Sequence, residues 1–428
     1  MTTPSLVATD RRGHLVVHPF YRMAVFDGRE TRAPREDELV PLPPGSDLWR
    51  MPGRLPVGIN PETGGPEIVG GGEAVAGFAS PAWLRLALPA FAREEGAPVL
   101  PLFAYSPLGW RNGRLVTTAV RVDRSNRQDP RRFRMREIAA ACRALRRRMP
   151  RNRLVEHLEH CARVYGCRAA QNFFLAREEC PLPTSPTCNS GCAGCLSLDP
   201  AGDVPAPHQR IAFVPDPEEI AEVALLHISR VPRPVVSFGQ GCEGEPLLVA
   251  PVLAEAIRRI RSRTGAGTIH LNTNGSRPAA VADLCAAGLD SIRLSVNSFR
   301  REAYEAYFAP RGYGLEDVLE SGRVVAGSGG FVSVNLLAFP GVTDAEADVE
   351  ATLRGLRECR ADLVQMRNLN IDPDVYRERL GDRDMGPVMG LKDAMSRMRG
   401  ARPDLRFGYF NPPVRTLVLR RRRQGRQR

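Results

Sequence analysis

The sequence contains almost no lysine. Lys392 is the only one among the 60 basic residues, so the net charge of +12 rests almost entirely on arginine. Such a one-sided use of arginine indicates a bias of the coding sequence more than a function. A basic chain still favours anionic partners, but the charge alone does not identify one.

Several motifs of conventional enzymes are also missing. We find no HExxH, GxSxG or Walker A sequence, which argues against the metalloprotease, serine hydrolase and P-loop classes. No apolar run is long enough to span a bilayer, and residues 1–12 lack the apolar core of a secretion signal. We therefore expect a cytoplasmic protein without a membrane partner, whose 10 cysteines do not form disulfides.

What the sequence does contain is three cysteines in one short loop. Cys188, Cys192 and Cys195 follow the spacing C-x3-C-x2-C in a segment rich in glycine, serine and proline. A structural zinc usually has four protein ligands, whereas three thiolates on a [4Fe–4S] cluster leave one iron open for a small ligand. The loop therefore predicts an open iron–sulfur site. The alternative is a zinc-stabilised, non-catalytic binding module, with Cys180 or His208 as the fourth ligand.

Downstream of this loop, strand-like and helix-like segments alternate, which indicates βαβ units and a parallel sheet. We expect six strands, the first of them near Cys180–Ser185. The other five are expected at Pro234–Gly239, Thr268–Asn274, Ser291–Asn297, Phe331–Phe339 and Leu363–Ile371. Amphipathic helices are expected at Leu247–Arg263, Pro278–Ala287, Arg301–Val325 and Asp344–Cys359.

Polar side chains recur on one face of several of these strands. Uncharged polar groups beneath outer helices would be buried without partners, so we expect this face to point inward, toward a mouth at the carboxyl ends of the strands. The alternative is a hydrogen-bonded network with a structural role. The polar set comprises His270, Asn272, Asn274, Ser295, Asn297, Asn335, Asn368, Asn370 and Asp372.

The cysteine spacing and the strand pattern together resemble the radical S-adenosylmethionine (radical SAM) superfamily, whose signature is CxxxCxxC. The resemblance covers about residues 178–375. The segment 241–246, Gly-Cys-Glu-Gly-Glu-Pro, is similar to the family's GGEP-type motif with Cys242 and Glu243 inserted. The fold class implied is α/β: a partial (β/α)6 barrel with an N-terminal α+β module and a short C-terminal extension.

The resemblance implies two cofactors. Cys188, Cys192 and Cys195 would hold a [4Fe–4S] cluster, and S-adenosyl-L-methionine (AdoMet) would bind its open iron. An electron from a donor such as flavodoxin or ferredoxin would cleave AdoMet to methionine and a 5′-deoxyadenosyl radical, which attacks the substrate. No catalytic residue is assigned. The residues implied in AdoMet binding are Gly241, Glu243, Gly244, Glu245, Pro246, Asn272, Asn274, Ser295, Asn297 and Asn368.

Outside the barrel, which we expect over residues 171–380, the sequence predicts three further segments. Residues 1–127 form an accessory α+β module, with a helix over Ala82–Glu95 and a hairpin of Leu102–Tyr105 with Leu115–Val122. Residues 128–170 form a connector of two helices, the first of them rich in arginine. Residues 381–428 form an extension with a helix, a strand near Leu405–Phe410 and a disordered basic tail. The sequence does not identify the substrate, which is a small molecule or a peptide.

A few residues outside these motifs allow more than one interpretation. The arginines of the connector and the tail Arg420–Arg428 allow an enzyme of the same superfamily that modifies RNA, although no aromatic residues alternate with them. His157 and Cys161 share a helix face, which allows a metal site but more often marks an ordinary surface or core pair. Cys242 could act on a substrate radical or simply fit a tight turn. We expect Arg367 to face the barrel lumen and to orient an anionic group of AdoMet or substrate. Its strand parity is opposite to that of Asn368 and Asn370, so one of the two sets must point outward unless a bulge intervenes. In the alternative, Arg367 lies beneath a helix and pairs with a carboxylate such as Glu358 or Asp362.

Overall fold

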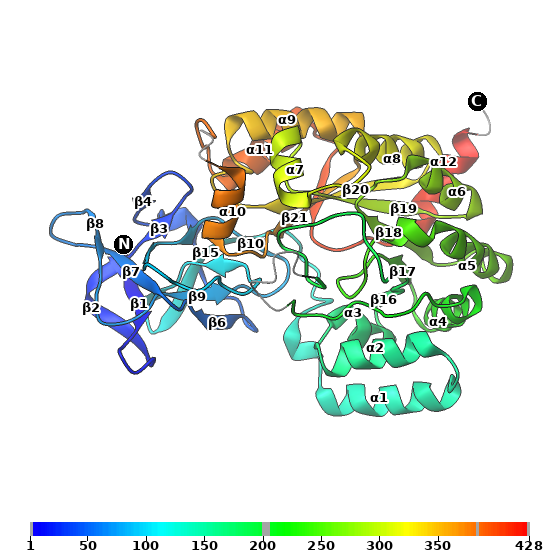
Figure 1. Cartoon of the computed structure of the whole chain (residues 1–428), viewed down its shortest axis with the longest axis horizontal. Helices are drawn as coiled ribbons and strands as arrows, with labels where there is room; N and C mark the ends of the chain where they lie inside the picture. Colours follow the sequence, from blue (N-terminus) through cyan, green and yellow to red (C-terminus); the bar gives the residue numbers. More distant parts are fainter. Residues whose placement is uncertain (1–2, 199–205, 382–384, 426–428) are drawn as a thin grey trace.

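The computed structural model describes residues 3–198, 206–381 and 385–425. A strand-rich module lies at one end of the molecule, and a parallel sheet flanked by helices lies at the other (Figure 1). Among the described residues, no helix combines the length and the apolar composition needed to cross a bilayer.

The N-terminal module is a sheet-rich unit of antiparallel strands, with one short 3-10 helix, η1 (Glu36–Glu38), in its described part. Its largest sheet has nine strands, in the order β10 (Trp83–Arg85), β15 (Arg114–Arg121), β14 (Gly109–Arg111), β1 (Ser5–Thr9), β2 (Leu15–Met23), β7 (Arg54–Ile59) and β12 (Phe91–Arg93), with β5 (Leu39–Pro41) beside β15 and β8 (Pro66–Ile68) beside β7. Two smaller sheets accompany it. They are formed by β11 (Leu88–Pro89), β3 (Val25–Phe26) and β4 (Thr31–Arg32), and by β13 (Tyr105–Ser106), β9 (Val75–Phe78) and β6 (Asp47–Arg50).

The helix expected over Ala82–Glu95 is wrong, because this stretch forms the strands β10, β11 and β12. Ala82 has a φ of 77°, which lies outside the helical region. Pro89 lacks the amide hydrogen that a helix interior requires. The segment is therefore broken at two points where a helix would have to continue.

The expected hairpin forms around Asn112 and Gly113, but with a different first arm. Both residues have positive φ values, 53° and 77°, as the favoured two-residue hairpin turns require. The second arm is β15, as expected, whereas the first is β14 and not Leu102–Tyr105. Tyr105 belongs to β13 and pairs with β9 instead.

The connector begins with η2 (Pro130–Arg132) and contains both expected helices, α1 (Met135–Arg148) and α2 (Arg153–Arg163). A third helix, α3 (Arg168–Phe174), follows them and was not expected. In α1 the buried stripe consists of Ile138, Cys142 and Leu145, so most arginines of this helix lie on its outer face.

The central feature is a half-barrel of seven parallel strands that follow one another in sequence order (Figure 1). All six expected strands are present, and a seventh comes from the C-terminal segment. The strands are β16 (Glu179–Pro181), β17 (Val235–Phe238), β18 (Thr268–Thr273), β19 (Ser291–Val296), β20 (Phe331–Ala338), β21 (Leu363–Asn368) and β22 (Arg406–Gly408). The connecting helices are α4 (Pro217–Arg230), η3 (Pro246–Val249) with α5 (Ala250–Arg263), α6 (Pro278–Ala287), α7 (Arg301–Phe308), α8 (Leu315–Gly327) and α9 (Glu346–Glu358). The partial barrel expected from the sequence is confirmed.

The stretch Arg301–Val325, expected as one helix, is divided between α7 and α8. The reason lies in the residues between them. Ala309 ends α7 with a φ of 40°, and Pro310 follows, which restricts the residue before it and lacks an amide hydrogen. The bend matters for the site, because the end of α7 supports the cysteine loop described below.

The C-terminal segment packs against the barrel through α10 (Pro373–Leu380), α11 (Leu391–Ala401), β22 and α12 (Arg415–Gly425). The strand expected near Leu405–Phe410 is present as β22, which pairs in parallel with β21. The disordered tail is wrong as far as residue 425, because α12 runs to that point. Arg421 forms an ion pair with Asp362 at 2.6 Å, and Arg422 donates to the carbonyl of Leu289 at 2.5 Å. Residues 426–428 lie outside the described part of the chain.

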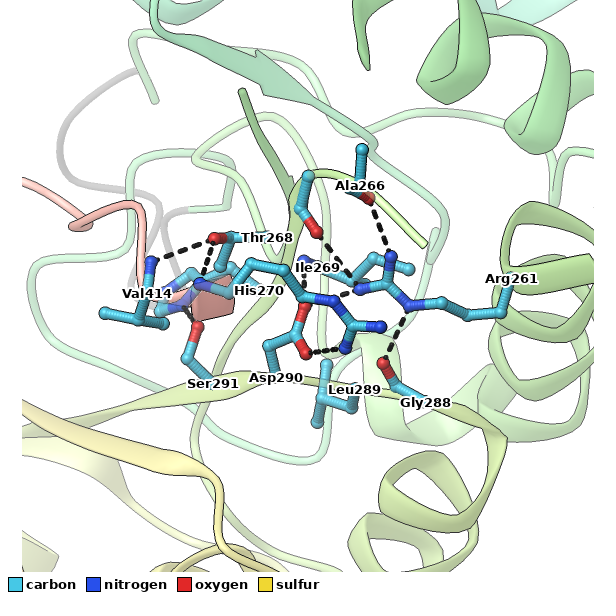
Figure 2. A network of polar contacts seen from close by, with 12 residues as sticks. Arg261, Ala266, Thr268, Ile269, His270, Gly288, Leu289, Asp290, Ser291 and Val414 are labelled. Carbon is cyan, nitrogen blue, oxygen red and sulfur yellow. Dashed lines mark hydrogen bonds and ion pairs between the residues drawn. The ribbon is translucent and has the colours of Figure 1, made fainter. Parts of the chain in front are cut away.

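A buried carboxylate fixes the start of α12 to the barrel. Asp290, just before β19, accepts from Arg261 of α5 and from Arg415 of α12, each at 2.5 Å. The hydroxyl of Thr268 accepts from the amide of Val414 at 2.9 Å. Figure 2 shows Arg261, Asp290, Thr268 and Val414 gathered where β18 and β19 begin. Because both carboxylate oxygens are paired, the charge of Asp290 is compensated within the fold.

A second buried ion pair joins the N-terminal module to the barrel. Arg54 of β7 and Asp372, which caps α10, are 0% and 1% exposed, and Arg54 Nη2 lies 2.8 Å from Asp372 Oδ2. The same carboxylate accepts from the amide of Leu100 at 2.8 Å. The module is therefore fixed at the carboxyl end of β21, beside the barrel mouth.

Candidate functional site

The loop 188–195, called the cysteine loop here, follows β16 at the carboxyl edge of the parallel sheet. The amide of Ala193 donates to the carbonyl of Tyr307 at 2.9 Å, so the loop runs along the end of α7. A Cβ atom on Gly194 would lie 2.7 Å from the Tyr307 hydroxyl, closer than such contacts allow. The small residues between the cysteines are therefore required by this close packing.

The spacing of the three sulfurs is wider than a single metal ion requires. A tetrahedral zinc with Zn–S bonds of about 2.3 Å holds its sulfurs about 3.8 Å apart. Only one trio of histidine, cysteine or acidic side chains in the described residues has all its ligand atoms within 4.8 Å of one another, and it is not this one. A cubane binds each thiolate at a different iron and accommodates the wider spacing. The loop therefore fits a cluster better than zinc.

The surroundings of the cysteine loop disfavour free thiolates. Burial, together with the nearby Glu245, raises the pKa of Cys188, and burial with the two neighbouring sulfurs raises the pKa of Cys192. Without a cation these thiols therefore stay protonated, and a bound metal group would hold them deprotonated. Arg210 adds a positive charge, with Nη2 at 3.6 Å from Cys195 Sγ.

The segment 241–246, which follows β17, packs directly against the cysteine loop. The amide of Gly244 donates to the carbonyl of Ser185 at 2.6 Å, and that of Glu245 donates to the carbonyl of Thr187 at 2.8 Å. A Cβ atom on Gly244 would overlap the Thr187 carbonyl. Only glycine allows this approach, which explains the glycine between the two glutamates.

The two glutamates of this segment are both buried, but their hydrogen bonds differ in number. Glu243 accepts four hydrogen bonds, from the amides of Thr184, Ser185 and Gln240 and from the Thr184 hydroxyl. Glu245 accepts three, from the hydroxyl of Thr273 and the amides of Asn274 and Leu247. In each carboxylate one oxygen accepts a single hydrogen bond, Glu243 Oε1 from Gln240 and Glu245 Oε2 from Asn274. Each of the two oxygens therefore keeps an acceptor position.

Glu243 should make the stability of the protein depend on pH. Burial raises its pKa from 4.5 to about 7, so its contribution to stability is fully present below about pH 4.5 and is lost as the pH rises to about 7. We expect the free energy of unfolding of Glu243→Gln, relative to the wild type, to rise between about pH 5 and about pH 8. Urea unfolding of protein without metal measures this. Glu358→Gln, at an exposed position of α9, is the control, and a difference independent of pH would contradict the assignment.

These elements enclose a cavity of about 500 Å³ at the carboxyl ends of the strands, lined by all three cysteines of the loop. A second cavity, of about 580 Å³ beside α10, has no cysteine or histidine among its described lining residues. Among the described residues, cysteine and histidine side chains therefore line the first of these two cavities and not the second. Of the residues implied in AdoMet binding, nine line it: Gly241, Glu243, Gly244, Glu245, Pro246, Asn272, Asn274, Ser295 and Asn368.

Asn297 lies outside this cavity, contrary to expectation. Its amide group donates to the carbonyl of Ala303 at 2.9 Å and to the hydroxyl of Tyr376 at 3.0 Å. The reason is that β19 ends at Val296, so the alternation that places Ser295 inward stops before Asn297. Asn297 instead holds α7 and α10 against the end of β19.

Two inward polar side chains belong to a structural network, the alternative that the sequence left open. Asn272 donates to the carbonyls of Phe238 and Gly239 at 2.7 and 2.9 Å. His270 donates to Asn272 Oδ1 at 3.0 Å and accepts from the hydroxyl of Ser291 at 2.6 Å. Burial, with Arg293 nearby, lowers the pKa of His270 to about 3, so its ring is neutral. Neither side chain has a free group for a ligand.

Asn411, in the C-terminal segment, completes this network from the opposite side. Its amide donates to Glu179 of β16 at 2.8 Å and to Asn272 at 3.2 Å, and its carbonyl oxygen accepts from Gln365 of β21 at 2.9 Å. One side chain thereby connects the first, third and sixth strands across the lumen.

Asn274 is committed to hydrogen bonds within the protein, whereas Ser295 is not. The amide of Asn274 donates to Asn189 Oδ1 at 2.9 Å and to the Ser190 hydroxyl at 3.0 Å, so it positions the cysteine loop. Ser295 lines the cavity opposite Asn335 in the register of β19 and β20. Neither the Ser295 nor the Asn335 side chain has a hydrogen-bond partner within the described ranges, and Asn335 Oδ1 is buried. They are therefore free to bind a ligand.

Arg367 faces the cavity, as expected from the sequence. Its guanidinium stacks over the ring of Tyr409 at 4.2 Å and donates to the Tyr409 carbonyl at 3.2 Å. Arg293 lies in the same cavity and donates to Gln365 at 3.2 Å. In the part of the chain that the structure describes, neither guanidinium forms an ion pair with a carboxylate. The cavity is consequently positive on this side.

Because Arg367 points inward, the side chain of Asn368 points outward. It hydrogen-bonds to the backbone of the N-terminal module, with 2.9 Å to the Trp83 carbonyl and 2.9 Å to the Arg85 amide. Only the main chain of Asn368 is left to contact a ligand. Asp372, also expected to face the lumen, pairs with Arg54 instead.

Three residues of the site were missed from the sequence: Arg210, Arg293 and Asn411. Arg293 precedes Ser295 by two positions in β19, so strand alternation could have found it. Arg210 and Asn411 lie on irregular segments, where no periodicity predicts the direction of a side chain.

A loop of three thiols at the carboxyl edge of a parallel half-barrel, facing a polar cavity, is an arrangement that suits a bound metal cluster. The family model described as the Radical SAM superfamily matches residues 182–354, which contain the cysteine loop and the strands β17 to β20. The chain therefore contains a radical SAM domain over these residues, which are less than half of its length. A search of the curated proteins gives no match.

Three of the solved structures to which the chain is similar are described here. A radical SAM methyltransferase from Sphaerobacter thermophilus is 15% identical with a TM-score of 0.37, over 55% of this chain and 67% of that one. Methylornithine synthase (PylB) is 16% identical with a TM-score of 0.38, over 62% and 76%. The protein anSMEcpe with bound AdoMet is 14% identical with a TM-score of 0.35, over 45% and 52%, so the alignment spans about half of that chain.

Proposed function

We propose that the chain binds a [4Fe–4S] cluster through Cys188, Cys192 and Cys195 and binds AdoMet in the adjoining part of the cavity. The observation that supports this most directly is the cysteine loop itself, whose three widely spaced thiols face the same cavity as the segment 241–246. When bound and reduced, such a cluster supplies the electron that cleaves AdoMet. The residues of the chain bind, orient and shield the reactants.

Glu245 is the better partner for the amino group of AdoMet, because it is the glutamate that lies close enough to Cys188 to raise the pKa of that thiol. Its Oε2 accepts a single hydrogen bond, from the amide of Asn274, and so keeps an acceptor position. Ser295 and Asn335 supply uncommitted polar groups farther along the cavity wall. Asn272, Asn274 and Glu243 hold the cavity in shape.

We infer further that the substrate, or the carboxylate of AdoMet, places an anionic group beside Arg293 and Arg367. Both guanidinium groups are half-buried and line the cavity, and an anionic group of the ligand would supply the carboxylate or phosphate partner that neither has among the described residues. The stacking of Arg367 on Tyr409 holds the guanidinium group in one orientation. This assignment follows from the chemistry of the cavity and leaves the identity of the substrate open.

The test is anaerobic reconstitution of the purified chain with iron and sulfide. We expect about four irons per chain and, with dithionite or a flavodoxin-type donor, conversion of AdoMet to 5′-deoxyadenosine and methionine. Quantifying both products by chromatography measures the reaction. A chain that binds zinc at these cysteines and takes up no iron would sink the proposal.

A further inference from the structure

A second group of metal-binding side chains lies in the wall of the same cavity, apart from the cysteine loop. His157 and Cys161 are one turn apart on α2, and Cys242 belongs to the segment after β17. His157 Nε2 lies 3.4 Å from Cys242 Sγ and 3.5 Å from Cys161 Sγ. The three ligand atoms all lie within 4.8 Å of one another, and they form the only such trio of histidine, cysteine or acidic residues in the described part of the chain.

These distances match the requirements of one tetrahedral metal ion. With Zn–N bonds of about 2.0–2.1 Å and Zn–S bonds of about 2.3 Å, the nitrogen and each sulfur lie about 3.5–3.6 Å apart. The two observed nitrogen–sulfur distances agree with this within 0.2 Å. A zinc ion could therefore bind with almost no movement of His157, Cys161 or Cys242.

Hydrogen bonding and metal binding use the trio differently. A neutral imidazole nitrogen has one lone pair and accepts one hydrogen bond, so only one of the two thiols that converge on Nε2 can donate to it. The other thiol can donate to the neighbouring sulfur, because Cys161 and Cys242 also hydrogen-bond to each other. A metal ion would instead bind the nitrogen and both sulfurs together, after the thiols have lost their protons.

The position of the trio fits a site with one open coordination position. Cys161 and Cys242 are buried, at 1% and 6% exposure, and both line the cavity that contains the cysteine loop. His208 lines the same cavity, and its Nδ1 atom is buried without a partner among the described residues. It lies outside the 4.8 Å group, however. The protein thus offers three ligands and a side that faces the cavity.

We propose that His157, Cys161 and Cys242 bind a zinc ion whose fourth position faces the cavity and is open to water or to a donor atom of the substrate. Three protein ligands with an exchangeable fourth are the usual arrangement of catalytic zinc sites. The ion would also join α2 to the segment 241–246 and thereby fix that segment next to the cysteine loop. This inference does not depend on the cluster, because the two sites share no ligand.

The site can be tested in a chain whose cysteine loop cannot bind metal. In the variant Cys188→Ala, Cys192→Ala, Cys195→Ala, purified without chelator and desalted, we expect about one zinc per chain by mass spectrometry. Replacing that zinc by cobalt should give the visible bands and the thiolate charge-transfer band of tetrahedral cobalt. Adding His157→Gln, Cys161→Ser or Cys242→Ser should lower the zinc content at least about tenfold.

Two control variants sharpen the result. Cys142→Ser, in the buried stripe of α1, should retain the zinc. His208→Ala should retain it as well, and loss of zinc there would overturn the open fourth position. Because Cys161 is buried, His157→Gln at a half-buried position tests the site with the core unchanged. Absence of zinc from the triple variant, or zinc that persists after the trio is replaced, would overturn the site.

Discussion

Replacing Cys192 by alanine is expected to abolish cluster binding and AdoMet cleavage together. Removing residues that merely hydrogen-bond to metal ligands already lowers affinity or activity 10–100-fold, so removing a ligand should lower cleavage by more than about 100-fold. Cys192 sits between the other two thiols in the loop, and its backbone neighbour Ala193 is held to Tyr307. The fold of the loop should therefore survive the substitution while the cluster is lost. Iron content and 5′-deoxyadenosine formation are the measurements.

The control for this variant is Cys285→Ala, on α6 and away from the cavity. It should keep both the iron and the cleavage activity. If the Cys192 variant retained about four irons and normal cleavage, the assignment of the loop as the cluster ligand set would be wrong. If it lost iron but kept its melting temperature, the loop would be shown to serve the cofactor and not the fold.

Replacing Asp372 by alanine is expected to destabilise the protein by up to about 3–5 kcal/mol. The substitution removes the closest carboxylate from Arg54, which is 0% exposed, and leaves it only Asp374 at 3.6 Å. It also removes the cap of α10, worth about 1 kcal/mol. Equilibrium unfolding by urea measures the loss. The effect should appear in both the module and the barrel, because the pair connects the two.

A double variant separates the ion pair from its surroundings. Arg54→Met combined with Asp372→Leu removes both charges, so it should be less destabilised than the sum of the two single changes. Asp393→Ala, at an exposed position of α11, should have little effect on stability. Additive losses in the double variant would show that the two side chains do not depend on each other.

The barrel was predictable because its sequence pattern is local. Each strand and each outer helix has its own periodicity, and the parallel order follows from the alternation of the two. Arg367 was placed correctly on the lumen face, whereas Asn368, next to it in β21, had to point the other way. Strand parity required one of the two sets to point outward, and the structure shows that the side chain of Asn368 does so.

What the sequence could not show depends on contacts between distant segments. Cys242 lies 81 residues after Cys161 and meets it only through the fold, so His157 and Cys161 looked like an isolated pair. The arginines of α12 looked like a solvated tail, because their partners, Asp362 and the carbonyl of Leu289, come from other parts of the barrel. The N-terminal module was harder still, since its short strands carry little periodicity.

The contacts of Asn411 have a consequence for the order in which the protein can mature. A chain emerges from the ribosome with its N-terminal part first, and its domains fold as units. Glu179, on the first strand of the barrel, would have Ser237 but not Asn411 as a side-chain partner until residue 411 has been made. The cavity can therefore reach its final shape only after that residue has been added. Delivery of a cluster to the completed cavity should then follow the synthesis of this segment.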